Sequence, residues 1–469
     1  MGEKKQLNTD IHVVAKKKRR VGFFDADSGI EANECIKIFL VSSKEEVGDS
    51  NSCCIEPVDL NGFFDDDDGK IYGYQGLKIT VWFNIISFST YVDISYKKKV
   101  DGGKGITDLK SAMEKIFADT VVDDKDTFIK SFSSENNLIS SIISQGELLF
   151  STCENFHVDT HNRIKGLSSD LKVIRLKFDN AAAGILYCRL VPLVLLLIDG
   201  SNPIEVTDPR WELYALIQCQ KGKQGDVDHR LVGFTVIYRF YQYPEHVRMR
   251  LGQILVLPPF QRRGFGRQIL EVVNNVAVSE DVYDLTVEEP LDLFQRVRTC
   301  FDVQRLMTFA PIQEALDSAV SVVKEAHSSE KEALPRMVPS SAVEQVRRSL
   351  KINRKQFLQC WEVLVYLRLD PIEKYLHNFV VLTSNRIRAD LLGKDTAGGT
   401  KKLVEIPSEY SPEMSFAVVP LGNGEGNALQ VAENQASVEE QLQKLVDDRI
   451  NDIRLIAQKV RRDSPSLQM

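Results

Sequence analysis

The chain has 469 residues, of which 43% are hydrophobic and 27% charged, and its formal net charge at pH 7 is −7. This length predicts about two to four domains with ordinary soluble cores. The negative balance argues against general nucleic-acid binding and is compatible with a basic partner. The longest apolar run, residues 191–198, is far shorter than the ~20 residues that span a bilayer. We therefore expect no transmembrane helix, and no signal peptide before the first charged cluster.

Cysteine and histidine usage argues against a metal site. The chain has 8 cysteines and 7 histidines, and no two cysteines form a Cys-x-x-Cys pair. Structural zinc sites need such clustered ligands, so we expect no metal. Reduced, buried thiols in a cytoplasmic or nuclear protein are the expectation for Cys35, Cys53, Cys54, Cys153, Cys188, Cys219, Cys300 and Cys360.

The first 30 residues have the composition of a flexible, basic tail. Within it, the run Lys16-Lys17-Lys18-Arg19-Arg20 favours a nuclear import signal. A solvated basic tail that no receptor reads is the alternative.

Residues 31–180 predict an N-terminal α+β domain. Strand-like runs occupy residues 36–41, 77–83 and 91–96, and the last two alternate and carry aromatic side chains, as paired strands do. A helix is expected over residues 107–118, and residues 119–180 show a mixed pattern.

Residues 181–335 predict a second domain with a mostly antiparallel sheet. An apolar helix is expected between residues 186 and 198, despite Pro192, followed by antiparallel strands at 211–217 and 231–238. A strand at 252–257, a helix at 264–278 and a strand at 283–287 then form a crossover unit. The last strand should lie parallel to the strand at 252–257, because a helix joins them.

The C-terminal region predicts helices. Residues 336–385 read as a helical packing appendage whose core face holds Phe357, Cys360, Trp361, Leu364, Val365 and Leu367. Residues 386–436 read as a linker, and a capping box at Ser437 and Glu440 begins a terminal helix over residues 437–463. The apolar stripe of this helix comprises Val438, Leu442, Leu445, Val446, Ile450, Ile453 and Val460. Docking on the body and binding a partner remain equal alternatives for this stripe.

The most informative segment is the turn between the strand at 252–257 and the helix at 264–278. Pro258 and Pro259 end the strand, and Gly264 and Gly266 allow the backbone to approach a ligand closely. The first N–H groups of the helix have no intrahelical partner and meet an anion at the positive end of the helix dipole. A dinucleotide-binding fingerprint would need a third glycine, but Ile269 stands at that position. The Gly-Lys-Ser/Thr sequence of an ATP-binding loop does not occur in the chain.

The pattern Gln-x-x-Gly-x-Gly after a strand resembles motif A of the GCN5-related N-acetyltransferases (GNAT), whose ligand is acetyl-CoA. A plain strand–turn–helix is the alternative. Acetyl transfer to lysine needs a neutral amine, and at pH 7 only about one lysine in two thousand is unprotonated. A carboxylate near the thioester is the obvious base, and Glu288 and Glu289 stand at the end of the next strand, before Pro290. A solvated, proline-terminated turn is the alternative for this pair.

Five segments in order make the resemblance narrower: Gly73–Ile79, Asp208–Trp211, Tyr241–Pro244, Gln261–Gly266 and Leu285–Pro290. Over about residues 30–380 the chain resembles the type B histone acetyltransferase catalytic subunits. The resemblance implies a GNAT fold and transfer of acetyl from acetyl-CoA to tail lysines of newly made, free histone H4. It further implies a β-propeller histone chaperone as partner, no direct binding of nucleic acid or membrane, and a location in nucleus and cytoplasm.

The resemblance also implies roles for particular residues. Glu288 matches the family's general base, Glu289 stands where the family usually has Asp, and Asp199 stands where a third acid is usually Glu. The strand whose backbone binds the acetyl-pantetheine arm matches Ile254, Leu255 and Val256. The pyrophosphate turn matches Gln261, Arg262, Arg263, Gly264, Phe265, Gly266 and Arg267. The histone-tail groove matches the acidic run Asp65, Asp66, Asp67 and Asp68 and the segment Tyr238, Arg239 and Phe240.

Direct acetyl transfer to free histone H4 in a ternary complex is therefore the predicted activity. An acetyltransferase for another basic protein or a polyamine is one alternative. A non-catalytic, acyl-CoA-binding histone carrier is another, which retention of Glu288 and of the intact glycine turn disfavours.

Overall fold

The computed structural model describes residues 29–64, 69–100, 105–134, 142, 144–152, 170–221, 227–325, 338–391 and 428–463. Two compact units divide the chain: residues 1–234 with 255–261 form one, and residues 235–254 with 262–469 form the other. Within the described residues, no helix is long and apolar enough to cross a membrane.

A four-stranded sheet organises the N-terminal part of the first unit. Its strand order is β3 (Cys53–Ile55), β2 (Ile36–Val41), β6 (Lys78–Asn84), β7 (Thr90–Ser95), and β2 runs parallel to β6. Side chains alternate along these strands, so residues such as Ile38, Leu40 and Val81 are buried. The expected strands at 36–41, 77–83 and 91–96 are confirmed to within one residue at each end.

Helices and short elements complete this part. The helix expected at 107–118 is α2 (Leu109–Phe117). Its N-cap residue is Asp108, whose side chain accepts hydrogen bonds from the Lys110 and Ser111 N–H groups. A second helix, α3 (Lys125–Ser134), follows. The short elements are α1 (Ala32–Cys35), η2 (Lys44–Glu46), η3 (Asn61–Phe63), η4 (Ala118–Thr120), β1 (Ile30–Glu31), β4 (Lys70–Ile71), β5 (Tyr74–Gln75) and β8 (Lys98–Lys99).

The second sheet has six strands. Their order is β14 (Leu285–Val287), β13 (His246–Val256), β12 (Val227–Gln242), β11 (Trp211–Lys221), β10 (Asp170–Lys177), β9 (Glu147–Ser151). Strands β9, β10 and β11 pair antiparallel, whereas β13 and β14 pair parallel. The sheet therefore begins before residue 170, and the expected boundary at 180/181 separates β9 and β10 from the sheet to which they belong.

An apolar helix, α5 (Ala181–Leu197), packs against α2 and against β10 and β11 within the first unit. The Asn180 side chain caps it by accepting a hydrogen bond of 3.0 Å from the Ala182 N–H. Apolar neighbours on more than one side explain why its sequence shows no polar face. The expected helix at 186–198 is confirmed, with Pro192 inside it and an earlier start.

The expected crossover unit is confirmed. Helix α6 (Phe265–Ser279) joins β13 to the parallel strand β14, and the expected face of Ile269, Leu270, Val273 and Val276 is buried. A short helical turn, η6 (Pro258–Phe260), separates β13 from the glycine turn, as the two prolines require.

The C-terminal part of the second unit is helical. Its elements are α7 (Asp292–Met307), η7 (Ala310–Ile312), α8 (Gln313–Glu325), α9 (Ser340–Leu350), α10 (Arg354–Arg368), α11 (Glu373–Leu391) and α12 (Ala428–Asp463). The core face expected for residues 340–383 is buried, except that Leu367 is only partly covered. The expected linker 386–436 is shorter than predicted, because α11 extends to Leu391 and α12 begins at Ala428.

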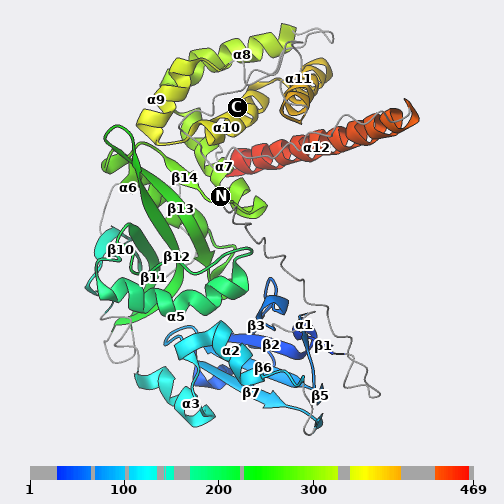
Figure 1. The fold of residues 1–469 in the computed structure, drawn as a ribbon. Helices are drawn as coiled ribbons and strands as arrows, with labels where there is room; N and C mark the ends of the chain where they lie inside the picture. Colours follow the sequence, from blue (N-terminus) through cyan, green and yellow to red (C-terminus); the bar gives the residue numbers. More distant parts are fainter. Residues whose placement is uncertain are drawn as a thin grey trace, which may run out of the picture. The chain divides into compact units, whose positions relative to one another are not determined.

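The apolar stripe of the terminal helix packs on the helices of its own unit. Of the two alternatives for this stripe, docking on the body is therefore the one that the structure shows. Helix α12 lies against α7, α10 and α11 (Figure 1). It buries Leu442, Val446, Ile450, Ile453 and Val460 in their common core, whereas Leu445 is 45% exposed. The Arg449 guanidinium also lies 2.7 Å from the buried Glu362 carboxylate of α10.

The thiols differ partly from expectation. Cys35, Cys219 and Cys360 are free and buried, and Cys53 and Cys300 are half-buried. Cys54 and Cys188 are exposed, so the expectation of burial is wrong for these two. Cys153 and the basic run at residues 16–20 lie outside the described residues.

Candidate active site

The turn after β13 has the geometry of an anion site. Gly264 precedes α6 with φ 89° and ψ 0°, a left-handed conformation that favours glycine. No side chain caps the helix there, so its first N–H groups remain available to a ligand. Residues 261–264 are exposed, and Phe265 anchors the start of the helix in the core with 2% exposure.

The Gln261 side chain orders the turn. Its Nε2 donates a hydrogen bond of 2.9 Å to the Val256 carbonyl, which ties the turn to the end of β13. The backbone N–H of Gln261 donates to the Pro258 carbonyl at 3.2 Å. The Arg262 backbone has a positive φ of 63°, and the Arg262 and Arg263 side chains are exposed. The turn thus combines open N–H groups with two arginines, a donor set that fits a pyrophosphate.

Strand β13 is longer than its partner on one side. Within β13, strand β14 pairs only with Met249–Leu251. Just after these pairs, the Glu288 N–H donates a hydrogen bond of 2.9 Å to the Leu251 carbonyl. The last five residues of β13 continue past that point to Val256. Among the described residues, no strand continues the ladder of β14 along this end of β13. An extended ligand can therefore lie there, beside Ile254, Leu255 and Val256.

The two faces of β13 differ. Met249, Leu251 and Leu255 are buried, whereas Arg250, Ile254 and Val256 on the other face are half-buried. Alternation along a strand produces this difference. The half-buried face is the one that a ligand can reach.

Glu288 and the aromatic segment meet on this accessible face. The Arg250 guanidinium lies 3.8 Å from the Glu288 carboxylate and 4.3 Å from the centre of the Phe240 ring. The Tyr238 and Phe240 rings contact each other with centroids 4.6 Å apart. Arg250 therefore connects the candidate base, Glu288, with the candidate substrate-binding aromatic pair. No role for Arg250 was predicted from the sequence.

The other expected acids are exposed or lie outside the described residues. Glu289 follows Glu288 with a positive φ of 34° and an exposed side chain. Asp199 is exposed in the bend after α5, in the other unit. The Asp65–Asp68 run lies outside the described residues.

Arg239 is not brought together with Tyr238 and Phe240. It alternates with them along β12, so its side chain lies on the opposite face of the sheet. There its guanidinium is 2.6 Å from the Glu280 carboxylate, at the C-terminal end of α6.

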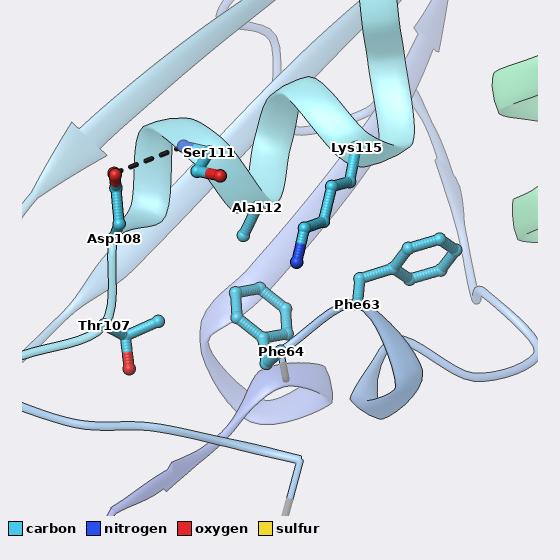
Figure 2. A pocket seen from close by; sticks show the side chains of 7 residues that line it. All are labelled: Phe63, Phe64, Thr107, Asp108, Ser111, Ala112 and Lys115. Carbon is cyan, nitrogen blue, oxygen red and sulfur yellow. Dashed lines mark hydrogen bonds between the residues drawn. The ribbon is translucent and has the colours of Figure 1, made fainter. Parts of the chain in front are cut away.

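A pocket lies at the start of α2. Figure 2 shows the Lys115 side chain extending from α2 toward Phe63 and Phe64, with Asp108 at the helix N-terminus. The remaining lining residues are Thr107, Ser111 and Ala112. Because the pocket contains both a lysine and an aspartate, its own charge does not select a basic ligand.

Comparisons with known proteins agree with this geometry. The family model described as "Histone acetyl transferase HAT1 N-terminus" matches residues 28–199, and that of the acetyltransferase (GNAT) family matches residues 205–296. Together with the strand–turn–helix–strand unit, the second match makes the protein a GNAT acetyltransferase. Enzymes of this class use acetyl-CoA, which is therefore the co-substrate. Among the described residues, no cluster of three or more metal-ligating side chains occurs.

Whole-chain similarity narrows the class to a family. A relative from Arabidopsis thaliana is 51% identical over 472 residues and covers 100% of both chains. One from Zea mays is 41% identical, covering 97% of this chain and 96% of its own, and one from Mus musculus is 25% identical, covering 84% and 86%. Each is named histone acetyltransferase type B catalytic subunit. The chain belongs to the family of type B histone acetyltransferase catalytic subunits.

Proposed function

We propose that this enzyme transfers acetyl from acetyl-CoA directly to lysine side chains in the N-terminal tail of free histone H4, with Glu288 as general base. The observation that carries the proposal is the place of Glu288. Its side chain is 51% exposed directly after β14, on the accessible face of the sheet, where β13 continues beyond its ladder with β14.

The proposed chemistry follows from this placement. The glycine turn holds the pyrophosphate of acetyl-CoA, and the arm extends along the end of β13. Glu288 takes a proton from the lysine ammonium, directly or through a water molecule, and the neutral amine attacks the thioester carbonyl. The carbon–sulfur bond breaks, CoA leaves as the thiol, and the amide forms. Holding both reactants in one site lowers the barrier by several kcal/mol.

Support for histone H4 comes from the family and from charge. The relatives are named histone acetyltransferases. The acidic run Asp65–Asp68, which the family resemblance assigns to binding the histone tail, has a charge that suits a lysine-rich peptide. Tyr238 and Phe240 supply apolar contact for the methylene stem of a lysine. We also propose Asp199 and Glu289 as secondary acids of the site.

Replacing Glu288 by Gln tests the base, with Glu289→Gln as a matched control one residue away. We expect Glu288→Gln to lower kcat at least ~100-fold while acetyl-CoA binding changes less than about twofold. Glu289→Gln should retain more activity, because the carboxylate that Arg250 contacts is that of Glu288. Activity within about threefold of the parent protein for Glu288→Gln would show that the base is another group. Acetyl-CoA binding by the parent protein without transfer to any histone would favour the carrier alternative.

Partner and location are further parts of the proposal. By family resemblance, we propose a β-propeller histone chaperone as partner, no direct binding of nucleic acid, and a location in nucleus and cytoplasm. The run Lys16–Arg20 supports nuclear import, and its replacement by alanines should retain the protein in the cytoplasm. Unchanged nuclear entry of that variant would contradict the import role.

A further inference from the structure

Strand β14, which Glu288 directly follows, is held on its second side by the helical region. In the ladder with β13, residue Met249 is paired with Leu285, but the polar groups of Leu285 itself point away from β13. The Leu285 N–H donates instead to the Lys351 carbonyl at 2.8 Å, and Leu285 forms a parallel bridge with Ile352. The connection between α9 and α10 thus substitutes for a further strand.

The Leu285 carbonyl accepts two side-chain hydrogen bonds. The Asn353 amide Nδ2 and the Arg298 guanidinium each donate to it at 3.2 Å. Leu285 is 3% exposed, so without these donors its carbonyl would be buried and unsatisfied.

Both donors are themselves fixed by other contacts. Asn353 caps α10, because its Oδ1 accepts a hydrogen bond of 3.0 Å from the Gln356 N–H. Arg298 is 7% exposed and lies 4.0 Å from the Asp302 carboxylate. Asp302 in turn accepts from Gln356 Nε2 at 3.0 Å and from Arg305 at 3.1 Å.

We infer that Asn353 and Arg298 are positioning residues for catalysis, which set the place of Glu288 by holding the Leu285 carbonyl. Leu285 begins β14, which has only three ladder pairs with β13, and Glu288 is the first residue after this strand. A shift of this short strand therefore moves the carboxylate relative to the acetyl-CoA arm along β13. The inference rests on the proposed role of Glu288, and it gives the α9–α10 connection a part in catalysis beyond packing.

Asn353→Asp isolates the interaction. The aspartate keeps an oxygen that caps α10, since Asp is as good a capping residue as Asn. It loses the Nδ2 donor and places a carboxylate oxygen against the Leu285 carbonyl. Asn353→Ser also keeps a cap and removes the donor without adding charge. Asn180→Asp is the matched control, because Asn180 caps α5 in the same way and has no part in β14.

We expect Asn353→Asp to lower kcat about 10-fold or more, with the KM for acetyl-CoA changed less than about twofold. Asn353→Ser should give a smaller loss, and Asn180→Asp should stay within about twofold of the parent kcat. Hydrogen exchange of the segment 284–288 should become faster in Asn353→Asp. In a Glu288→Gln background, Asn353→Asp should cause less than about a twofold further loss, because its effect acts through Glu288.

The outcomes separate this inference from the proposed function. A large loss for Glu288→Gln with unchanged kcat and exchange for Asn353→Asp would overturn the inference alone. An active Glu288→Gln enzyme together with an impaired Asn353→Asp enzyme would overturn both the base and positioning through it. Multiplicative losses in the double variant would also overturn positioning through Glu288.

Discussion

The docked position of α12 predicts a large difference between two leucines one turn apart. Leu442 is 3% exposed in the core shared by α7, α10 and α11, whereas Leu445 is 45% exposed. Replacing a buried leucine by alanine removes its transfer free energy and leaves a cavity, a loss of about 2.7–5 kcal/mol. Replacing an exposed leucine on a helix usually changes stability by less than about 0.5 kcal/mol, partly because alanine is the better helix former.

Trp361 provides the assay, because it is buried in the same core and packs against Phe357. The chain has 3 tryptophans, so a Trp82→Phe, Trp211→Phe background leaves Trp361 as the single fluorescent reporter. Urea unfolding followed through Trp361 then compares Leu442→Ala with its control Leu445→Ala. Equal stabilities of the two variants, or a loss below about 1 kcal/mol for Leu442→Ala, would refute docking and favour α12 as a displayed binding helix.

Three further predictions concern other sites. Gly264→Ala places a side chain at φ 89°, so we expect a strained turn and acetyl-CoA binding weakened about 10-fold in calorimetry; unchanged affinity would contradict the turn's role. A hydrogen bond from Arg347 holds the pKa of Glu344 at about 2, so its stabilising effect is full above about pH 4.3 and lost as the pH falls toward 2. The gap in Tm between the parent protein and Glu344→Gln should therefore close on acidification, and a gap that widens would show the opposite sign. Burial raises the pKa of Cys360 well above its usual range, so a thiol reagent should label exposed Cys188 quickly and Cys360 only after unfolding; rapid labelling of Cys360 in the folded protein would contradict its burial.

The crossover unit could be predicted because its signals are local. Apolar residues recur with a period of two in the strand before the prolines and glycines and with a period of 3.6 in the helix after them. The prolines and glycines themselves indicate the turn between strand and helix. Strands β9 and β10 could not be recognised as part of this sheet, because they join it through the pairing of β10 with β11, which lies beyond helix α5 in the chain. The domain boundary predicted at residues 180/181 therefore falls inside the sheet.

The candidate site was only partly predictable for the same reason. The turn and Glu288 are contiguous motifs, but Arg250 becomes informative only when β12, β13 and β14 place it against Phe240 and Glu288. Strand alternation already separates Arg239 from its aromatic neighbours, a signal that their adjacency in sequence concealed. The pairing of Asn353 with Leu285 spans 68 positions and leaves no local pattern.

The most direct test of the proposed function is acetyl transfer from labelled acetyl-CoA to free histone H4, assembled nucleosomes and a polyamine, with mass spectrometry of the modified lysines. We predict strong labelling of free histone H4 near the start of its tail, little labelling of nucleosomes or polyamine, and loss of all labelling in Glu288→Gln. Preferred labelling of the polyamine or of nucleosomes would contradict the account.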